Sequence, residues 1–337
     1  MLTLDFTADD LAHTRFACSP LWELIESLRV RQDPSALVVH GPWEAASAAR
    51  LDGFPLDELL MLVPLGSYIP DFLTPPPEVS LPAIDDELDR MRGTPPRRIR
   101  ADVARRFAGR AVPDAARPYL ERPAAARDRL VELLREYWAR AIEPEWPRVR
   151  ALLEGEIVER ARQQALTGTG SLLGDLHPAV TWRKGTLRVR CRHTGRVALD
   201  GDGLILVPNV FAWPLVCPMV ADGYPAAMTY PPRGVGSLWA PPDGDGVALD
   251  ALLGRTRAAV LRELAAPCST SELARRLDLT PGAISLHLTV MQRSGLLIRR
   301  RAGRSVLYRV SAVGEALLAA AGVARPAAGR YPSAVDQ

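Results

Sequence analysis

The chain has 337 residues, of which 47% are hydrophobic and 24% charged, with a formal net charge of +3. This is the composition of a soluble folded protein with room for two or three domains. Lysine occurs once, at Lys184, so a high arginine content outside a motif is a compositional bias and does not indicate nucleic-acid binding. Four cysteines lie far apart without paired spacing, which excludes a disulfide framework and indicates a reducing cytoplasm.

The start of the chain carries no pattern of an export signal, because Asp5, Asp9 and Asp10 interrupt the place where an apolar core would run. Residues 203–221 carry no charge and are long enough to cross a bilayer. Prolines within this stretch would break a membrane-spanning helix. We instead predict a buried strand over 204–207, followed by an irregular connection. We therefore expect a cytoplasmic protein with no membrane contact.

The first two thirds of the chain predict helices punctuated by proline. Residues 2–6 alternate like a short strand, and Asp9 or Asp10 is positioned to cap a helix that runs to about residue 30. Further helices are predicted over residues 56–65, 84–92, 97–107, 124–142 and 146–165.

The pattern changes to β after Gly170. Residues 180–182 and 186–191 predict a hairpin closed by Arg183-Lys184-Gly185, and 204–207 and 226–230 predict further strands. Residues 231–246 are rich in Pro, Gly and Asp, as a linker would be. We expect an α+β protein: an N-terminal dimerisation or effector domain that is mostly helical with a small antiparallel β part, then a winged helix-turn-helix. The expected divisions are a domain over 1–232 (helical 7–168, β-rich 178–232), a linker 233–248, a winged helix-turn-helix 249–323 and a flexible tail 324–337.

Residues 269–293 predict two short helices separated by a tight turn. Leu277 and Leu279 close the first helix, Thr280 can cap the second, and Pro281 occupies a first helical position where its missing N–H costs nothing. With Ile284 buried, a step of 100° per residue places Leu288 and Met291 on the same stripe.

The opposite face of this second helix is the predicted reader of a DNA major groove. Its expected DNA contacts are Thr280, Gly282, Ser285, Leu286, Thr289 and Arg293. Hydroxyl groups can bind base edges or phosphates, Leu286 can meet a thymine methyl, and Gly282 allows a phosphate to approach the helix N-terminus.

Two β-type runs, 296–301 and 305–310, follow as a glycine-containing hairpin. Arg299, Arg300, Arg301 and Arg304 cluster at its tip, where they are predicted to contact the sugar-phosphate backbone or the minor groove. Residues 250–310 hold eleven arginines and four acidic residues, a net charge of +7, while the rest of the chain sums to −4. This concentration of charge supports a DNA reader more strongly than the overall balance does.

Residues 248–322 resemble the ArsR-type winged-helix regulators through Gly254-Arg255-Thr256-Arg257, Ser-Glu-Leu-Ala at 271–274, Thr-Pro-Gly-Ala-Ile-Ser at 280–285 and Gly-Arg-Ser-Val-Leu-Tyr at 303–308. The resemblance implies a dimeric repressor. Some members carry a Cys-x-Cys metal site where Ser269 and Ser271 stand here, with Cys268 nearby. One thiol cannot assemble the soft ligands that such a metal needs, so we expect no metal and no cofactor.

The opening region also resembles the long N-terminal segment of some actinobacterial ArsR-type regulators. The matching stretches are 6–11, 19–23, 70–76 and 176–178. This resemblance extends over most of the chain but names no effector.

The N-terminal part carries aromatic and titratable residues of the kinds that an effector site or an enzyme uses. Trp182, Phe211, Trp213 and Tyr230 fall in one sequence region with Tyr224 and Trp239, and could form a ligand pocket, a core or an interface. His177 beside Asp175, His193 beside Cys191, and Cys217 lack partners at a diagnostic spacing, so we predict no catalytic residue.

The sequence thus predicts a DNA-binding transcriptional regulator, a repressor by family resemblance, that binds double-stranded DNA as a homodimer at an inverted repeat. A small-molecule effector is possible. Alternatives are a protein-interaction or ligand-sensing module whose winged helix does not bind DNA specifically, and an N-terminal enzyme with a regulatory DNA-binding tail.

Overall fold

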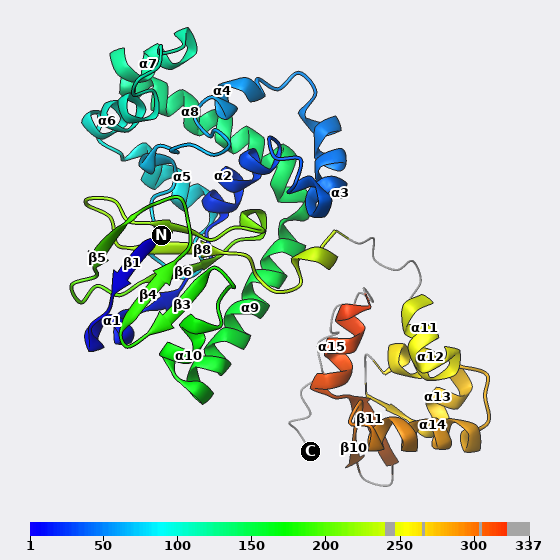
Figure 1. Cartoon of the computed structure of the whole chain (residues 1–337). Helices are drawn as coiled ribbons and strands as arrows, with labels where there is room; N and C mark the ends of the chain where they lie inside the picture. Colours follow the sequence, from blue (N-terminus) through cyan, green and yellow to red (C-terminus); the bar gives the residue numbers. More distant parts are fainter. Residues whose placement is uncertain (240–246, 265–266, 303–304, 322–337) are drawn as a thin grey trace, which may run out of the picture. The chain divides into compact units, whose positions relative to one another are not determined.

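The computed structural model describes residues 1–239, 247–264, 267–302 and 305–321, which fall into two units (Figure 1). The first unit is Met1–Trp239 and the second lies within Ala240–Gln337. The predicted α+β class is confirmed: a layer of helices and two small sheets make up the first unit, and helices with one small sheet make up the second.

The first unit begins with a strand and a short helix and then becomes mainly helical. Its helices are α1 (Ala8–His13), α2 (Pro20–Val30), α3 (Leu37–Ala48), α4 (Leu56–Leu60), α5 (Ile84–Arg92), α6 (Pro96–Arg106), α7 (Arg117–Glu121), α8 (Pro123–Tyr137), α9 (Trp146–Thr167) and α10 (Thr169–Gly174). The predictions for 84–92, 97–107, 124–142 and 146–165 are confirmed to within a few residues, whereas the predicted helix 56–65 ends early, at Leu60.

Two four-stranded sheets complete this unit. Its strands are β1 (Leu2–Asp5), β2 (Arg15–Phe16), β3 (Val180–Arg183), β4 (Thr186–Val189), β5 (Gly195–Ala198), β6 (Ile205–Pro208), β7 (Cys217–Met219) and β8 (Ala227–Tyr230). One sheet has the order β3-β4-β1-β5 and the other β2-β6-β8-β7. The hairpin between β3 and β4 turns at Lys184 and Gly185, which have positive φ angles of 48° and 78°. These angles fit a tight hairpin turn.

The sheets correct two predictions. They are mixed rather than purely antiparallel, because β1 is parallel to β5, and β6 is parallel to its neighbours β2 and β8. The helical part 7–168 and the β-rich part 178–232 are also not separate, since β2, at Arg15–Phe16, forms an edge of the second sheet. Strand β1, which precedes both parts, lies inside the first sheet. The start of the chain therefore folds together with strands near residue 200.

The predicted single helix from residue 9 or 10 to residue 30 is wrong. Thr7, rather than an aspartate, caps α1 and forms a capping box with Asp10. The buried Asp10 carboxylate accepts hydrogen bonds from the backbone N–H groups of Gly201 and Gly203 at 2.9 and 3.0 Å. Pairing of β2 with β6 then interrupts the helix, and Ser19 caps α2 as a new start.

The predicted linker, 233–248, begins too early. Val235, Leu238 and Trp239 are buried in the core formed by the helices of the first unit, so the domain extends to Trp239 rather than to residue 232. Helix α11 (Val247–Leu253) already covers the end of the predicted linker. Residues 240–246 and the predicted tail 324–337 lie outside the described residues.

The second unit contains α11, α12 (Arg255–Glu263), β9 (Cys268–Ser269), α13 (Thr270–Arg276), α14 (Pro281–Arg293), β10 (Leu297–Ala302), β11 (Ser305–Val310) and α15 (Ala312–Ala320). Its three strands have the order β10-β11-β9. Helices α12, α13 and α14 share a core with the base of the β10–β11 hairpin (Figure 1). This is the predicted arrangement of a winged helix-turn-helix.

Candidate nucleic-acid interface

The turn between α13 and α14 is built from local hydrogen bonds. The Ser269 hydroxyl accepts from the Glu272 N–H and caps α13, while the Thr280 hydroxyl accepts from the Ala283 N–H and caps α14. Asp278 adopts a positive φ of 53° between the two helices. The predicted cap at Thr280 with Pro281 in the first turn is confirmed.

Helix α14 buries the predicted stripe. Ile284 and Leu288 are 0% exposed and Met291 is 1% exposed, and all three belong to the core of the second unit. Burial of this stripe fixes the rotation of α14, so its opposite face is presented to solvent.

All six residues predicted to read DNA from this helix and its cap are exposed: Thr280, Gly282, Ser285, Leu286, Thr289 and Arg293. Leu286 is 71% exposed. Sequence reasoning missed Val290, one turn later and 51% exposed, although its i+4 spacing from Leu286 was a usable signal. The face therefore carries two adjacent apolar side chains as well as hydroxyl groups and an arginine.

Two residues of this face have identifiable local roles. The Thr289 hydroxyl donates to the Ser285 carbonyl at 2.8 Å, so its proton is used within the helix while its lone pairs remain available. A side chain at Gly282 would meet no atom of the protein within 4 Å. The fold of this unit therefore imposes no steric need for glycine there.

The wing arginines divide between two faces of the hairpin. In the β10–β11 register, Arg299 lies opposite Tyr308 and Arg301 opposite Val306, on the face that includes buried Leu297. Arg300 points to the other face, which it shares with Arg309. All four side chains are exposed. Arg304 lies outside the described residues.

Three acidic side chains of the second unit form ion pairs with arginines that lie outside α14 and the wing. Asp250 binds Arg262 at 2.7 Å, and Arg276 binds Glu272 at 2.5 Å and Glu263 at 3.4 Å. Over the described residues, no ion pair involves the cations of the outward face and the wing: Arg293, Arg299, Arg300, Arg301 and Arg309. Positive charge is thus left uncompensated along α14 and the hairpin.

The motif helix α13 offers no sign of a metal site. Ser269 caps the helix, and Cys268 is 1% exposed with a thiol pKa raised by burial. No group of three or more His, Cys, Asp or Glu side chains in the described residues is placed to hold a metal ion.

The aromatic residues predicted as a ligand pocket do not converge. Trp182 packs edge-on against Phe6 at 5.2 Å, and Tyr230 is buried in the same sheet core. Phe211 and Trp213 instead pack with the helical core, where Phe211 lies 5.2 Å from the His40 ring. The four residues therefore line two different cores rather than one pocket.

The titratable groups considered for catalysis also have separate partners. Asp175 binds Arg160, the His177 Nδ1 atom accepts from the Ala179 N–H, and the Cys217 thiol lies 3.8 Å from the Arg29 guanidinium. These contacts give no nucleophile, base and orienting group in hydrogen-bond reach of one another.

The comparison with family models agrees with the helix-turn-helix geometry of the second unit. Residues 252–300 match the family model of a helix-turn-helix domain, and residues 93–235 match a family of unknown function. Among solved structures, the chain is similar to reduced HlyU from Vibrio cholerae, with 32% identity over a match that covers 22% of this chain and 80% of that chain, and a TM-score of 0.20. No curated protein matches. No helix in the described residues is long and apolar enough to cross a membrane.

Proposed function

We propose that this helix-turn-helix protein is a sequence-specific transcriptional regulator of the ArsR type that binds double-stranded DNA. The observation that carries the proposal is the separation of charge in the second unit. Its acids Asp250, Glu263 and Glu272 neutralise Arg262 and Arg276, whereas the arginines on α14 and the wing remain exposed and unpaired over the described residues. Such a surface suits the phosphates of a duplex.

The recognition face gives each residue a distinct proposed role. Ser285, Thr289 and Arg293 read base edges or phosphates, Leu286 contacts a thymine methyl, and the α14 N-terminus with Thr280 and Gly282 approaches a phosphate. The wing residues Arg299, Arg300, Arg301 and Arg304 hold the sugar-phosphate backbone or the minor groove.

We further propose that the regulator is a cytoplasmic homodimer that represses transcription from an inverted-repeat operator. Helices α11 and α15 carry the exposed apolar side chains Leu252 and Val313, which are 67% and 62% exposed. Exposed apolar residues on these helices support their use as a dimer contact. Two-fold symmetry would then place two α14 helices about one turn of DNA apart.

Selection of fragments of the source genome with the purified full-length protein tests this function. We expect enrichment of an inverted repeat that is bound about a thousandfold more tightly than random DNA. The Arg293→Ala variant should weaken binding, while Arg162→Ala, at an exposed arginine of α9, serves as the matched control.

Failure to enrich any sequence, with weak salt-sensitive binding alone, would contradict the proposal. It would instead favour a protein-interaction or ligand-sensing module whose winged helix does not bind DNA specifically. Binding of one half-site by a monomer that stays monomeric at micromolar concentration would contradict the dimer.

A further inference from the structure

The first unit has a surface cavity of about 270 Å³ between the start of α2, the segment before α5 and the junction of α8 with α9. Its lining is mainly apolar and aromatic, with one thiol and two charged groups. Its lining includes Cys18 and Pro20 at the start of α2, and Trp138, Glu143, Trp146 and Arg150 at the junction. None of them belongs to the aromatic set that the sequence suggested for a ligand.

An irregular backbone brings two indole rings to this cavity. Helix α8 continues into a π-helical turn over Trp138–Ile142, and α9 then begins at Trp146. The two rings pack edge to face with centroids 5.0 Å apart. Single π-helical turns are uncommon and frequently occur at functional sites, which supports this junction as a binding site rather than a plain helix connection.

Of the two charged groups that line the cavity, one has an ion-pair partner and the other has none in the described residues. Arg150 donates to Glu154 at 2.6 Å and is neutralised by it. The Glu143 carboxylate is exposed and has no ion pair or side-chain hydrogen bond over the described residues. The cavity thus combines indole rings with one uncompensated negative charge, and aromatic faces attract cations.

We propose that this cavity binds a small apolar organic cation, with its ammonium group near Glu143 and its apolar body against Trp138 and Trp146. An anion of the same shape would meet the unpaired carboxylate, and a neutral molecule would lose both the charge pair and the cation–π contact. The cation is the effector of the regulator, a role that rests on the proposed DNA-binding function.

Helix α9 connects this cavity to the chain segment that precedes the second unit. Arg148, in its first turn, donates to the Leu238 carbonyl. Further along, buried Glu156 accepts from the backbone N–H and the Nε of Arg233 at 3.3 and 3.2 Å. A ligand that shifts the start of α9 therefore acts on residues 233–239 through direct hydrogen bonds.

The binding site is tested by calorimetry on the full-length protein without DNA. Benzyltrimethylammonium is the cationic probe, benzyl alcohol the neutral one and benzylsulfonate the anionic one. We expect the cation to bind at one site per chain, and the other two to bind at least about tenfold more weakly. Absence of saturable cation binding, or equal binding of the three probes, would overturn the site.

Two substitutions locate the site. Glu143→Gln should weaken cation binding about threefold, because the carboxylate is exposed to solvent. Trp146→Leu should also weaken it, whereas Glu121→Gln, at an exposed glutamate of α7 without an ion pair in the described residues, should not. Unchanged cation affinity in Glu143→Gln would assign the binding to another place.

The regulatory role is measured separately, as DNA affinity with and without benzyltrimethylammonium. Sodium chloride at the same concentration controls for ionic strength. A cation-specific change of at least threefold is expected, and Arg233→Gln should reduce it while cation binding persists. Cation binding without any change in DNA affinity would refute the regulatory role alone. Loss of DNA binding under all conditions would refute the proposed function, and the calorimetry would still decide the site.

Discussion

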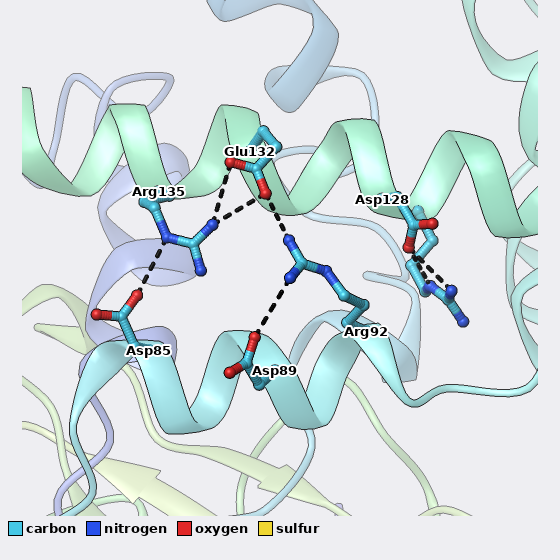
Figure 2. A network of polar contacts seen from close by, with 7 residues as sticks. Asp85, Asp89, Arg92, Asp128, Glu132 and Arg135 are labelled. Atoms are coloured by element: carbon cyan, nitrogen blue, oxygen red, sulfur yellow. Dashed lines mark hydrogen bonds and ion pairs between the residues drawn. The ribbon is translucent and has the colours of Figure 1, made fainter.

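Buried arginines of the first unit and outward arginines of the second unit differ in their partners. In the first unit, Arg31 and Arg160 have side chains that are 4% and 3% exposed and bind Glu44 and Glu156. Several surface arginines of that unit are also paired, as Figure 2 shows for Arg92 and Arg135, which join Asp85, Asp89 and Glu132 across α5 and α8. In the second unit, the outward arginines have no such partners over the described residues.

The contrast shows why an arginine count is a poor guide to nucleic-acid binding. The donors of each arginine side chain need acceptors, which carboxylates, carbonyl groups or water supply. Where the fold supplies carboxylates, arginine holds elements together. Where the nearby carboxylates pair with other arginines, as in the second unit, the outward arginines remain available to an external anion.

The largest effect should come from a buried arginine of the first unit. Replacing Arg160 by Met would leave the Glu156 carboxylate, which is 3% exposed, with Arg233 as its remaining cation. We expect unfolding free energy to fall by about 3 kcal/mol. Denaturant unfolding measures this loss, with the exposed Arg162→Ala as control. A variant as stable as the parent protein would show that buried pairing does not stabilise this unit.

A buried carboxylate without a cation should make the first unit sensitive to pH. Glu23 accepts from the Val210 and Phe211 N–H groups, and burial raises its pKa to about 8. Because the native state holds this proton more tightly than the unfolded state does, the stabilisation is complete below about pH 4.5 and is lost as pH rises through about 8.

We therefore expect the melting temperature of the first unit to fall by roughly 5 °C between pH 6 and pH 9. Glu23→Gln should flatten that decline, because the amide does not ionise. Differential scanning calorimetry at several pH values measures both proteins. An equal decline in the variant would assign the pH dependence to other groups.

Replacing an unpaired arginine of the wing should affect DNA binding and not stability. Arg300→Ala is expected to leave folding stability unchanged and to weaken binding to all DNA sequences by about three- to tenfold. Loss of one phosphate contact should also lower the slope of log affinity against log salt by about 1. Fluorescence anisotropy at four salt concentrations gives the slope, and an unaltered slope would show that Arg300 does not contact phosphate.

The smallest expected effect concerns the exposed apolar residues of α14. If Leu286 packs on a thymine methyl, replacing that thymine by deoxyuridine removes one buried methyl group and should weaken binding about fourfold. Leu286→Ala should bind the two DNA duplexes equally, while Thr289→Ala should still distinguish them. Equal binding by the parent protein would exclude methyl recognition at each substituted base.

Much of the second unit was predictable because its signals lie within short windows. Thr280 with Pro281 marks the start of a helix, and the spacing of Ile284, Leu288 and Met291 fixes its buried face. The distribution of the wing arginines over two faces followed from strand alternation once the register was known. The exposed pair Leu286 and Val290 carried a helical spacing that sequence reasoning left unused.

The first unit was predictable in its separate helices but not in their assembly. The periodicity of residues 84–92 determined α5, since a helix depends on neighbours three and four residues apart. The pairing of β1 with β4 and β5, and of β2 with β6, joins segments from opposite ends of the sequence of the first unit. No local sequence pattern specifies such partners. The same holds for 233–239, whose composition suggested a linker although Trp239 is buried beside His40.

The sequence by itself determined the helix-turn-helix, its caps, its buried stripe and the excess of positive charge in the second unit, because these depend on residue type and on near neighbours. Tertiary structure decided which arginines meet a carboxylate, which aromatic rings share a core, and where the cavity beside Trp138 and Trp146 opens. These features depend on contacts between distant segments, so they exist only when the whole unit has folded.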